Sequence, residues 1–285
     1  METSQLKFTE HNRDVVGLRY VYPVISRRAG GVSIGINLNT NNACNWRCVY
    51  CQVPDLKLGS APPVDMALLE HELRDFIGEL LHGNFMQTRV PDELRRINDI
   101  ALSGNGEPAS AAEFLQVIEL IARLREELEL PAAVKLVLIS NGSLMYRDNV
   151  QQGLRLMSRL NGEVWFKLDR ASAAGMAKIN DTHTRLEKVR ENLVTAINCC
   201  PNTWLQTCWF AIDGEAPARQ DEDDYLEFIN SLIINEINIA GVLLYGIARP
   251  SMQAEAGRLQ ALTLPQMEAF AARIRALNLP VKISA

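Results

Sequence analysis

The sequence lacks the features that mark membrane and secreted proteins. Its 285 residues contain no long uncharged apolar run, and the opening METSQLKFTEHNRD does not follow the basic-then-apolar order of a signal peptide. Internal repeats, low-complexity tracts and linker-like segments are also missing. We therefore expect a cytoplasmic protein that does not associate with membranes.

Positive charge is also scarce. The 29 Lys and Arg residues are outnumbered by 34 Asp and Glu residues, which gives a net charge of -5. Such a chain has no overall field that attracts nucleic acid, although a local basic patch would still allow a nucleic-acid partner. The balance of 47% hydrophobic and 22% charged residues is typical of soluble globular proteins. The net charge therefore disfavours RNA as a partner without excluding it.

The spacing of apolar residues changes repeatedly between the periods of strands and helices. Residues 1–31 read as an irregular lead-in, and apolar side chains then alternate from Val32 to Leu38, as in a strand. Further strand-like segments cover residues 97–103, 134–139, 164–168, 204–212 and 239–245, and helix-like segments cover residues 69–80, 114–124, 150–157, 186–197, 226–233 and 267–277. Ser110 and Glu113 have the spacing of a capping box. Six strand-then-helix units predict an α/β fold, a partial (β/α)6 TIM-like barrel over residues 32–285.

A cluster of cysteines directly follows the first predicted strand. Cys44, Cys48 and Cys51 lie in the run CNWRCVYC, so a short loop can point all three thiolates at one metal centre. Structural zinc sites and ordinary four-iron clusters usually have four protein ligands, so three cysteines leave one metal position open. The other cysteines, which we expect to be buried structural thiols, are Cys199, Cys200 and Cys208.

The unusual glycine-rich and polar residues fall after the predicted strands. In a barrel of this kind, the loops that follow the strands form the active-site rim. The segment GNGEP follows the second strand, and Ser140-Asn141-Gly142 follows the third. Glycines let the backbone approach a ligand closely, and Glu107 can accept a hydrogen bond from an ammonium group. These features together predict a site for an amino-acid-like ligand on one rim.

Three ionisable residues at this rim are candidates for substrate chemistry. Lys167 and Asp169 share a strand face with Trp165, where they would contact a ligand or form a structural ion pair. A desolvated Lys167 would also be able to form a Schiff base with a carbonyl substrate. Arg249 would either bind a carboxylate or phosphate or cap its own loop.

The least regular stretch is residues 249–263, which contains Pro250 and Gly257. It predicts either a mobile loop over one end of the barrel or an ordinary connection. We also consider Arg27 and Arg28 as residues that reach the rim.

The cysteine run resembles the signature of the radical S-adenosylmethionine (SAM) enzymes, with Tyr50 directly before the last cysteine. GNGEP is similar to the glycine-glycine-glutamate motif of that superfamily, with Asn105 as a departure from its commonest form. The ordered motifs YPVISRR, GINLN, CNWRCVYCQVP, SGNGEP, SNGS, FKLD and YGIARP are similar to compact radical SAM proteins related to tRNA 4-demethylwyosine synthases. This resemblance covers roughly residues 20–250.

The resemblance implies a cofactor pair and a reaction. Cys44, Cys48 and Cys51 would bind a [4Fe-4S] cluster, which would cleave SAM reductively so that a 5'-deoxyadenosyl radical abstracts a substrate hydrogen. An electron donor such as flavodoxin or ferredoxin would reduce the cluster. The implied SAM-binding residues are Tyr50 near the adenine, Gly104, Asn105, Gly106 and Glu107 at the methionyl end, Ser140 and Asn141 at the ribose or carboxylate, and Lys167.

Two alternatives remain open at this point. The wyosine enzymes carry a second cluster that uses cysteines ahead of the SAM motif, and no cysteine precedes Cys44 here. tRNA base modification of the wyosine-synthase type is therefore an alternative to a small metabolite or peptide substrate. The other alternative is a non-catalytic iron–sulfur or electron-transfer protein, in which a fourth ligand closes the site.

Overall fold

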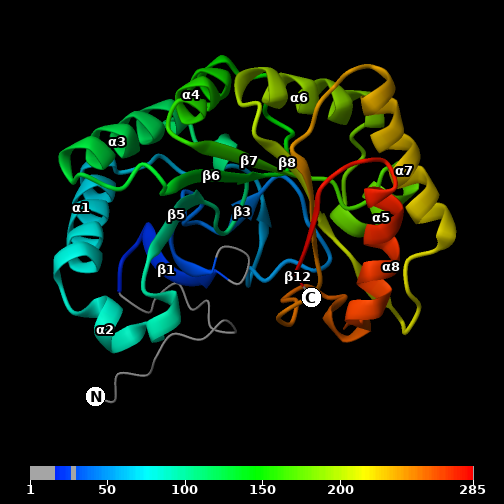
Figure 1. Ribbon diagram of the computed structural model, residues 1–285, viewed down its shortest axis with the longest axis horizontal. Helices are drawn as coiled ribbons and strands as arrows, with labels where there is room; N and C mark the ends of the chain where they lie inside the picture. Colours follow the sequence, from blue (N-terminus) through cyan, green and yellow to red (C-terminus); the bar gives the residue numbers. More distant parts are fainter. Residues whose placement is uncertain (1–16, 27–29, 285) are drawn as a thin grey trace.

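The computed structural model describes residues 17–26 and 30–284, and its centre is one eight-stranded sheet (Figure 1). The strand order is β1-β2-β5-β6-β7-β8-β10-β12. β1 pairs antiparallel with β2, and every later pairing in this sheet is parallel. The strands span Val21–Ser26, Gly31–Ile36, Ile97–Leu102, Lys135–Ser140, Gly162–Lys167, Thr203–Cys208, Gly241–Tyr245 and Val281–Ser284 in that order.

The helices cover the outer side of the curled sheet (Figure 1). They are α1 (Met66–His82), α2 (Phe85–Arg89), α3 (Phe114–Glu127), α4 (Asp148–Ser158), α5 (Ala173–Asn180), α6 (Leu186–Cys199), α7 (Arg219–Ile234) and α8 (Leu264–Arg275). Sheet and helices form an open half-barrel, which confirms the predicted α/β partial barrel. Within the described ranges, no helix is long and apolar enough to cross a bilayer.

The two faces of the sheet differ in polarity because side chains alternate along a strand. On β7, Val164 and Phe166 belong to the apolar core, whereas Glu163, Trp165 and Lys167 occupy the opposite positions. Glu163 Oε2 accepts a hydrogen bond of 2.9 Å from Trp165 Nε1. The outer face therefore packs against helices, and the inner face is left to polar chemistry.

Several predicted elements need correction. The supposed lead-in over residues 1–31 contains strand β1, and residues 204–212 divide into β8 and the short strand β9 (Phe210–Ile212), which pairs with β11 (Leu259–Ala261). Helix α5 was not predicted.

The predicted capping box at Ser110 is wrong. Glu113 precedes α3 without a side-chain capping bond. Ser110 Oγ instead accepts hydrogen bonds from Ala61 N at 2.8 Å and Asn39 Nδ2 at 3.2 Å. The hydroxyl thus joins three separate loops at the rim.

Helix α1 holds the start of β1 through one buried carboxylate. Glu72 is only 4% exposed, and it accepts hydrogen bonds from the backbone N–H groups of Arg19, Tyr20 and Val21 at 2.8, 2.8 and 3.2 Å. Arg19 and Tyr20 directly precede β1, and Val21 is its first paired residue. Hydrogen bonds to a charged group are the stronger kind, so this contact anchors the edge of the sheet.

We expect Glu72→Gln to lower the free energy of unfolding by about 2–3 kcal/mol, because the amide nitrogen cannot accept a backbone N–H. Asp75→Asn on the same helix is the matched control, since its side chain is 63% exposed, and it should change stability by less than about 0.5 kcal/mol. Urea denaturation measures the free energy of unfolding of the two variants. Equal stability of the two variants would show that the Glu72 contacts do not anchor β1.

Candidate functional site

One cavity of about 270 Å³ lies at the rim of the half-barrel and is lined by all three clustered cysteines. The cysteines come from the loop after β2. The remaining walls come from Tyr22 of β1, from the ends of β6 and β7, and from the segments after β5, β6 and β10. The predicted residues that line it are Cys44, Cys48, Cys51, Tyr50, Gly104, Asn105, Gly106, Glu107, Asn141, Lys167 and Arg249. Ser140 and Asp169 do not line it but bind residues that do.

Little regular structure fixes the cysteine loop. Cys44 lies in the two-residue strand β3 (Ala43–Cys44), which pairs with β4 (Lys57–Leu58), and Cys51 N donates to Cys48 O at 2.9 Å. Asn180 Nδ2 at the end of α5 lies 3.2 Å from Cys48 Sγ. Burial raises the pKa of Cys44 to about 12 and that of Cys48 to about 11. Metal binding must therefore displace thiol protons.

The donor set is one that an iron–sulfur cluster can use, because three thiols line one cavity. In a cuboidal cluster each cysteine binds a different iron. Among residues 17–26 and 30–284, no group of three or more His, Cys, Asp or Glu side chains is placed to hold a single metal ion.

The glycines of GNGEP allow the loop after β5 to pack against the cysteine loop. A Cβ on Gly106 would lie 2.0 Å from the carbonyl oxygen of Ala43, next to Cys44. Gly104 has a φ of +153°, and its Cβ would lie 2.4 Å from Asn37 Oδ1. That oxygen also accepts a hydrogen bond of 3.0 Å from Asn105 N. Only glycine permits this approach, so GNGEP is more than a surface turn.

Glu107 is buried at the wall of the cavity. Its carboxylate accepts hydrogen bonds from Ala109 N at 3.0 Å, Ser140 Oγ at 2.8 Å and Asn141 N at 2.7 Å. Burial raises the pKa of Glu107 above its ordinary value, and these hydrogen bonds oppose the rise. A carboxylate offers about four acceptor positions, so one remains for a ligand such as an ammonium group.

Asp169 organises the floor behind the cysteines. Its carboxylate accepts hydrogen bonds from Tyr50 Oη at 2.5 Å, Asn180 Nδ2 at 2.6 Å and Cys208 N at 2.7 Å. Asn180 also contacts Cys48, so Asp169 acts on the cysteine loop through Tyr50 and Asn180. Asp169 and Lys167 do not form an ion pair within the described part of the chain.

Lys167 projects into the cavity from the end of β7. Its Nζ lies 2.9 Å from Tyr245 Oη and 5.0 Å from the centre of the Tyr50 ring. Burial opposes the charge, but Tyr245, Asp169 and Cys48 favour it, so the pKa of Lys167 lies above its ordinary value. The cavity thus contains a fixed cation between two aromatic rings.

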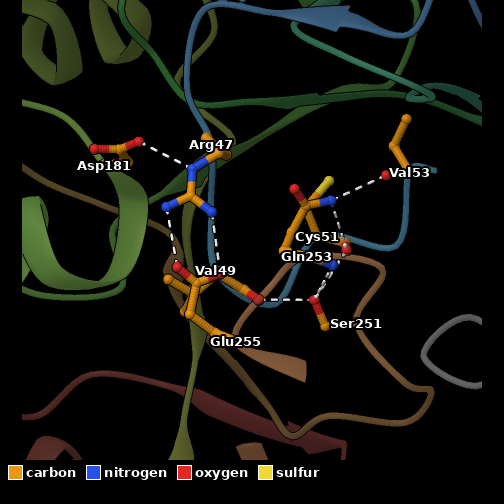
Figure 2. Close-up of polar contacts among 8 residues, drawn as sticks. All are labelled: Arg47, Val49, Cys51, Val53, Asp181, Ser251, Gln253 and Glu255. Atoms are coloured by element: carbon orange, nitrogen blue, oxygen red, sulfur yellow. Dashed lines mark hydrogen bonds and ion pairs between the residues drawn. The ribbon is translucent and has the colours of Figure 1, made fainter. Parts of the chain in front are cut away.

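The segment after β10 is tied to the cysteine loop, as Figure 2 shows. Arg47, in the middle of the cysteine run, donates to both carboxylate oxygens of Glu255 at 3.0 Å and to Asp181 Oδ2 at 3.0 Å. The bidentate geometry fixes the guanidinium in one plane. Arg47 therefore joins the cysteine loop to the end of α5 and to residue 255.

The same segment binds the backbone of the cysteine loop (Figure 2). Ser251 Oγ donates to the carbonyl oxygens of Val49 at 2.7 Å and Cys51 at 3.1 Å. Gln253 Nε2 donates to the carbonyl oxygens of Cys51 at 3.3 Å and Val53 at 3.0 Å. The prediction of a loose loop over residues 249–263 is therefore corrected. Ser251, Gln253 and Glu255, which we call the clamp, bind the cysteine loop, and the segment continues into β11.

Other predicted residues are placed as follows. Cys199, Cys200 and Cys208 are buried and free, which confirms them as buried thiols. Arg27 and Arg28 lie outside the described residues. The sequence interpretation missed Arg47, Asn180, Ser251, Gln253 and Glu255. Of these residues, only Arg47 could have been found from the sequence, because it is a charged residue within the cysteine run to which no role had been given.

No protein-family model matches the chain. A UPF0026 protein of Helicobacter pylori strain 26695 is 27% identical over 231 residues, which cover 80% of this chain and 66% of that protein. The corresponding protein of strain J99 is 26% identical over 61% of this chain and 50% of its own length. The chain thus spans between half and two thirds of these curated relatives.

Solved structures resemble the chain over most of its length. Streptococcus suis SuiB bound to the precursor peptide SuiA has a TM-score of 0.58 and 9% identity, covering 90% of this chain and 49% of SuiB. TYW1 with a lysine–pyruvate adduct has a TM-score of 0.52 and 14% identity, covering 86% and 73% of the two chains. anSMEcpe with bound AdoMet has a TM-score of 0.52 and 15% identity, covering 87% and 63%. The chain therefore has the partial-barrel fold of the radical SAM enzymes.

Proposed function

We propose that this protein is a radical SAM enzyme whose active site is the cavity lined by the cysteines. The observation that carries the proposal is that three free cysteines, the GNGEP loop and the half-buried Lys167 line the same cavity. Cys44, Cys48 and Cys51 would hold a [4Fe-4S] cluster there. When bound, the cluster would supply the one-electron reduction that splits SAM into methionine and a 5'-deoxyadenosyl radical, and that radical would take a hydrogen atom from a substrate. The part of the protein is to hold both cofactors and to position the substrate beside them.

The residues around the cavity suit the polar end of SAM. Glu107 retains an acceptor position for the amino group, and the cation of Lys167 suits the carboxylate. Tyr50 presents a ring that is fixed by its bond to Asp169. Ser140 supports Glu107, while Asn141 lines the cavity and donates to Asn45 Oδ1 at 2.8 Å.

A Schiff-base role for Lys167 is a second possibility, since one similar structure, TYW1, holds a lysine–pyruvate adduct. An amine must be neutral to attack a carbonyl group. The surroundings of Lys167 raise its pKa and keep it charged. We therefore assign Lys167 an electrostatic role toward the SAM carboxylate.

The substrate we propose is a small metabolite or a peptide, with tRNA as the alternative. Support comes from the acidic net charge of -5 and from SuiB, which is bound to a precursor peptide. A one-electron donor such as flavodoxin or ferredoxin would reduce the cluster.

We expect the anaerobically reconstituted chain to form 5'-deoxyadenosine from SAM under reduction, and Cys48→Ala to reduce this product to background. Cys199→Ala is the matched control, because Cys199 is a buried free thiol that does not line the cavity. Iron and sulfide content, together with product analysis by mass spectrometry, measure both variants.

The rival electron-transfer function predicts a different result. A reduced cluster whose paramagnetic resonance spectrum is unchanged by SAM, with no 5'-deoxyadenosine formed, would refute the enzyme proposal. Full activity of Cys48→Ala would refute it as well.

Gly106→Ala should reduce both iron content and SAM cleavage, because the new Cβ would displace the Ala43 carbonyl and with it Cys44. Gly257→Ala is the control, since a Cβ there would meet no atom within 4 Å. Iron per chain is measured after identical reconstitution. Equal iron content in the two variants would show that the close approach of Gly106 to the Ala43 carbonyl does not position the cysteines.

Lys167→Met should weaken SAM binding about 10- to 100-fold, the effect of losing a hydrogen bond to a charged group. Exposed Lys178→Met on α5 is the control. Equilibrium dialysis with SAM measures binding, and borohydride treatment with pyruvate tests the alternative role. Recovery of a reduced lysine adduct at Lys167 would contradict the electrostatic assignment.

A further inference from the structure

The end of helix α5 lies alongside the cysteine run and contacts three of its successive residues in reverse order. The contacts are Arg47 with Asp181, Cys48 with Asn180, and Val49 with Ile179. The outer two are the ion pair described above and a backbone hydrogen bond of 2.9 Å from Val49 N to Ile179 O. Asp181 has a φ of 49°, the left-handed conformation in which many helices end, so α5 stops at this junction. Cys48 is therefore held in the middle of a junction that is fixed on both sides.

Asn180 brings a side-chain amide to the sulfur of Cys48. Asn180 is only 1% exposed, and its Nδ2 lies 3.2 Å from Cys48 Sγ and 2.6 Å from Asp169 Oδ2. An amide nitrogen carries two hydrogens, so it can donate one to each of these acceptors. The opposite orientation of the amide would place its oxygen against the Asp169 carboxylate, with no proton between the two acceptors. The geometry thus requires an N–H group that faces the sulfur.

The carboxylate that orients this amide is itself fixed. Asp169 is 1% exposed, and it also accepts hydrogen bonds from Tyr50 Oη and Cys208 N. These contacts hold Asp169 in place, and Asp169 in turn holds one amide hydrogen of Asn180. The other amide hydrogen is therefore kept toward Cys48, as partners of metal ligands commonly are.

A hydrogen bond to a cysteine sulfur changes how readily an iron–sulfur cluster accepts an electron. Reduction makes the cluster and its sulfur ligands more negative. A donor N–H stabilises the more negative state more than the oxidised state, so it raises the reduction potential. The effect is greater in a buried site, where the low local dielectric strengthens a hydrogen bond.

We propose that Asn180 is a positioning residue that raises the reduction potential of the cluster through its hydrogen bond to Cys48. This inference rests on the part of the proposed function that places a [4Fe-4S] cluster on the three clustered cysteines, and it holds for any substrate. A higher potential lets a weaker one-electron donor reduce the cluster. The end of α5 therefore helps to decide which donors can serve this protein.

The test measures the reduction potential of the reconstituted chain by redox titration, monitored by paramagnetic resonance, without SAM. Asn180→Leu fills a similar space but removes the donor, so the ratio of reduced to oxidised cluster at a fixed potential should fall about three- to tenfold. This fall corresponds to a potential that is about 30–60 mV lower for a one-electron couple. Asp181→Asn is the matched control, because it weakens the neighbouring contact to Arg47 without removing a donor from the sulfur. Its potential should not fall, since the variant loses a negative charge.

A second measurement uses the unchanged chain and so does not depend on the folding of a variant. Asparagine labelled with ¹⁵N in its side-chain amide is incorporated, and pulsed paramagnetic resonance is recorded on the reduced cluster. We expect a ¹⁵N coupling and an exchangeable proton coupling from an amide that is bonded to sulfur. This measurement decides the outcome if Asn180→Leu takes up no cluster.

Each contrary result overturns the inference. A potential of Asn180→Leu that is equal to or above that of the unchanged chain, or an equal fall in Asp181→Asn, would show that Asn180 does not act through the sulfur. Absence of a ¹⁵N coupling in the unchanged chain would show the same. Failure of the unchanged chain to take up a cluster would refute both this inference and the proposed function. A lower potential of Asn180→Leu without 5'-deoxyadenosine formation by the unchanged chain would refute only the proposed function.

Discussion

The geometry of the site depends on the backbone hydrogen bonds that other parts of the chain make to the cysteine loop. Residues 45–56 form no helix or strand, so their polar backbone groups need partners elsewhere. Ser251 and Gln253 satisfy three of the carbonyl groups, and Arg47 adds ion pairs on the other side (Figure 2). A buried polar group without a partner costs about 1–3 kcal/mol, so these contacts favour one arrangement of the loop over its alternatives.

A second layer of polar contacts lies on the cavity side of the sheet. Asp169 and Glu107 are buried, and each carboxylate has three hydrogen-bond donors from the chain. Lys167 stands between aromatic rings without a direct ion pair to either carboxylate. This separation preserves the positive charge in the cavity and leaves it available to a ligand.

The sequence was enough to predict most strands, most helices and many, but not all, of the residues that line the cysteine cavity. Apolar residues that alternate along a strand, or recur with the period of a helix, indicate which side chains are buried. The loops that follow parallel strands all lie at the same edge of the sheet, so their residues come together. The clamp was missed because Ser251 and Gln253 act through hydrogen bonds to backbone carbonyl groups, which leave no periodic pattern in the sequence. Ser110 was misassigned for a related reason: a local capping motif was overridden by partners 49 and 71 residues away.

The clamp joins parts of the chain that lie far apart in the sequence. Ser251 and Val49 are separated by 202 residues, so their contact is a long-range constraint on the cysteine loop. The cysteines belong to the first third of the chain, but their loop gains its fixed shape from the segment between β10 and β11. Without that segment, the carbonyl groups of Val49, Cys51 and Val53 would lose these hydrogen-bond partners, and the loop would be free to adopt other arrangements. The proposed cluster site therefore depends on a segment far along the chain as well as on the cysteine run.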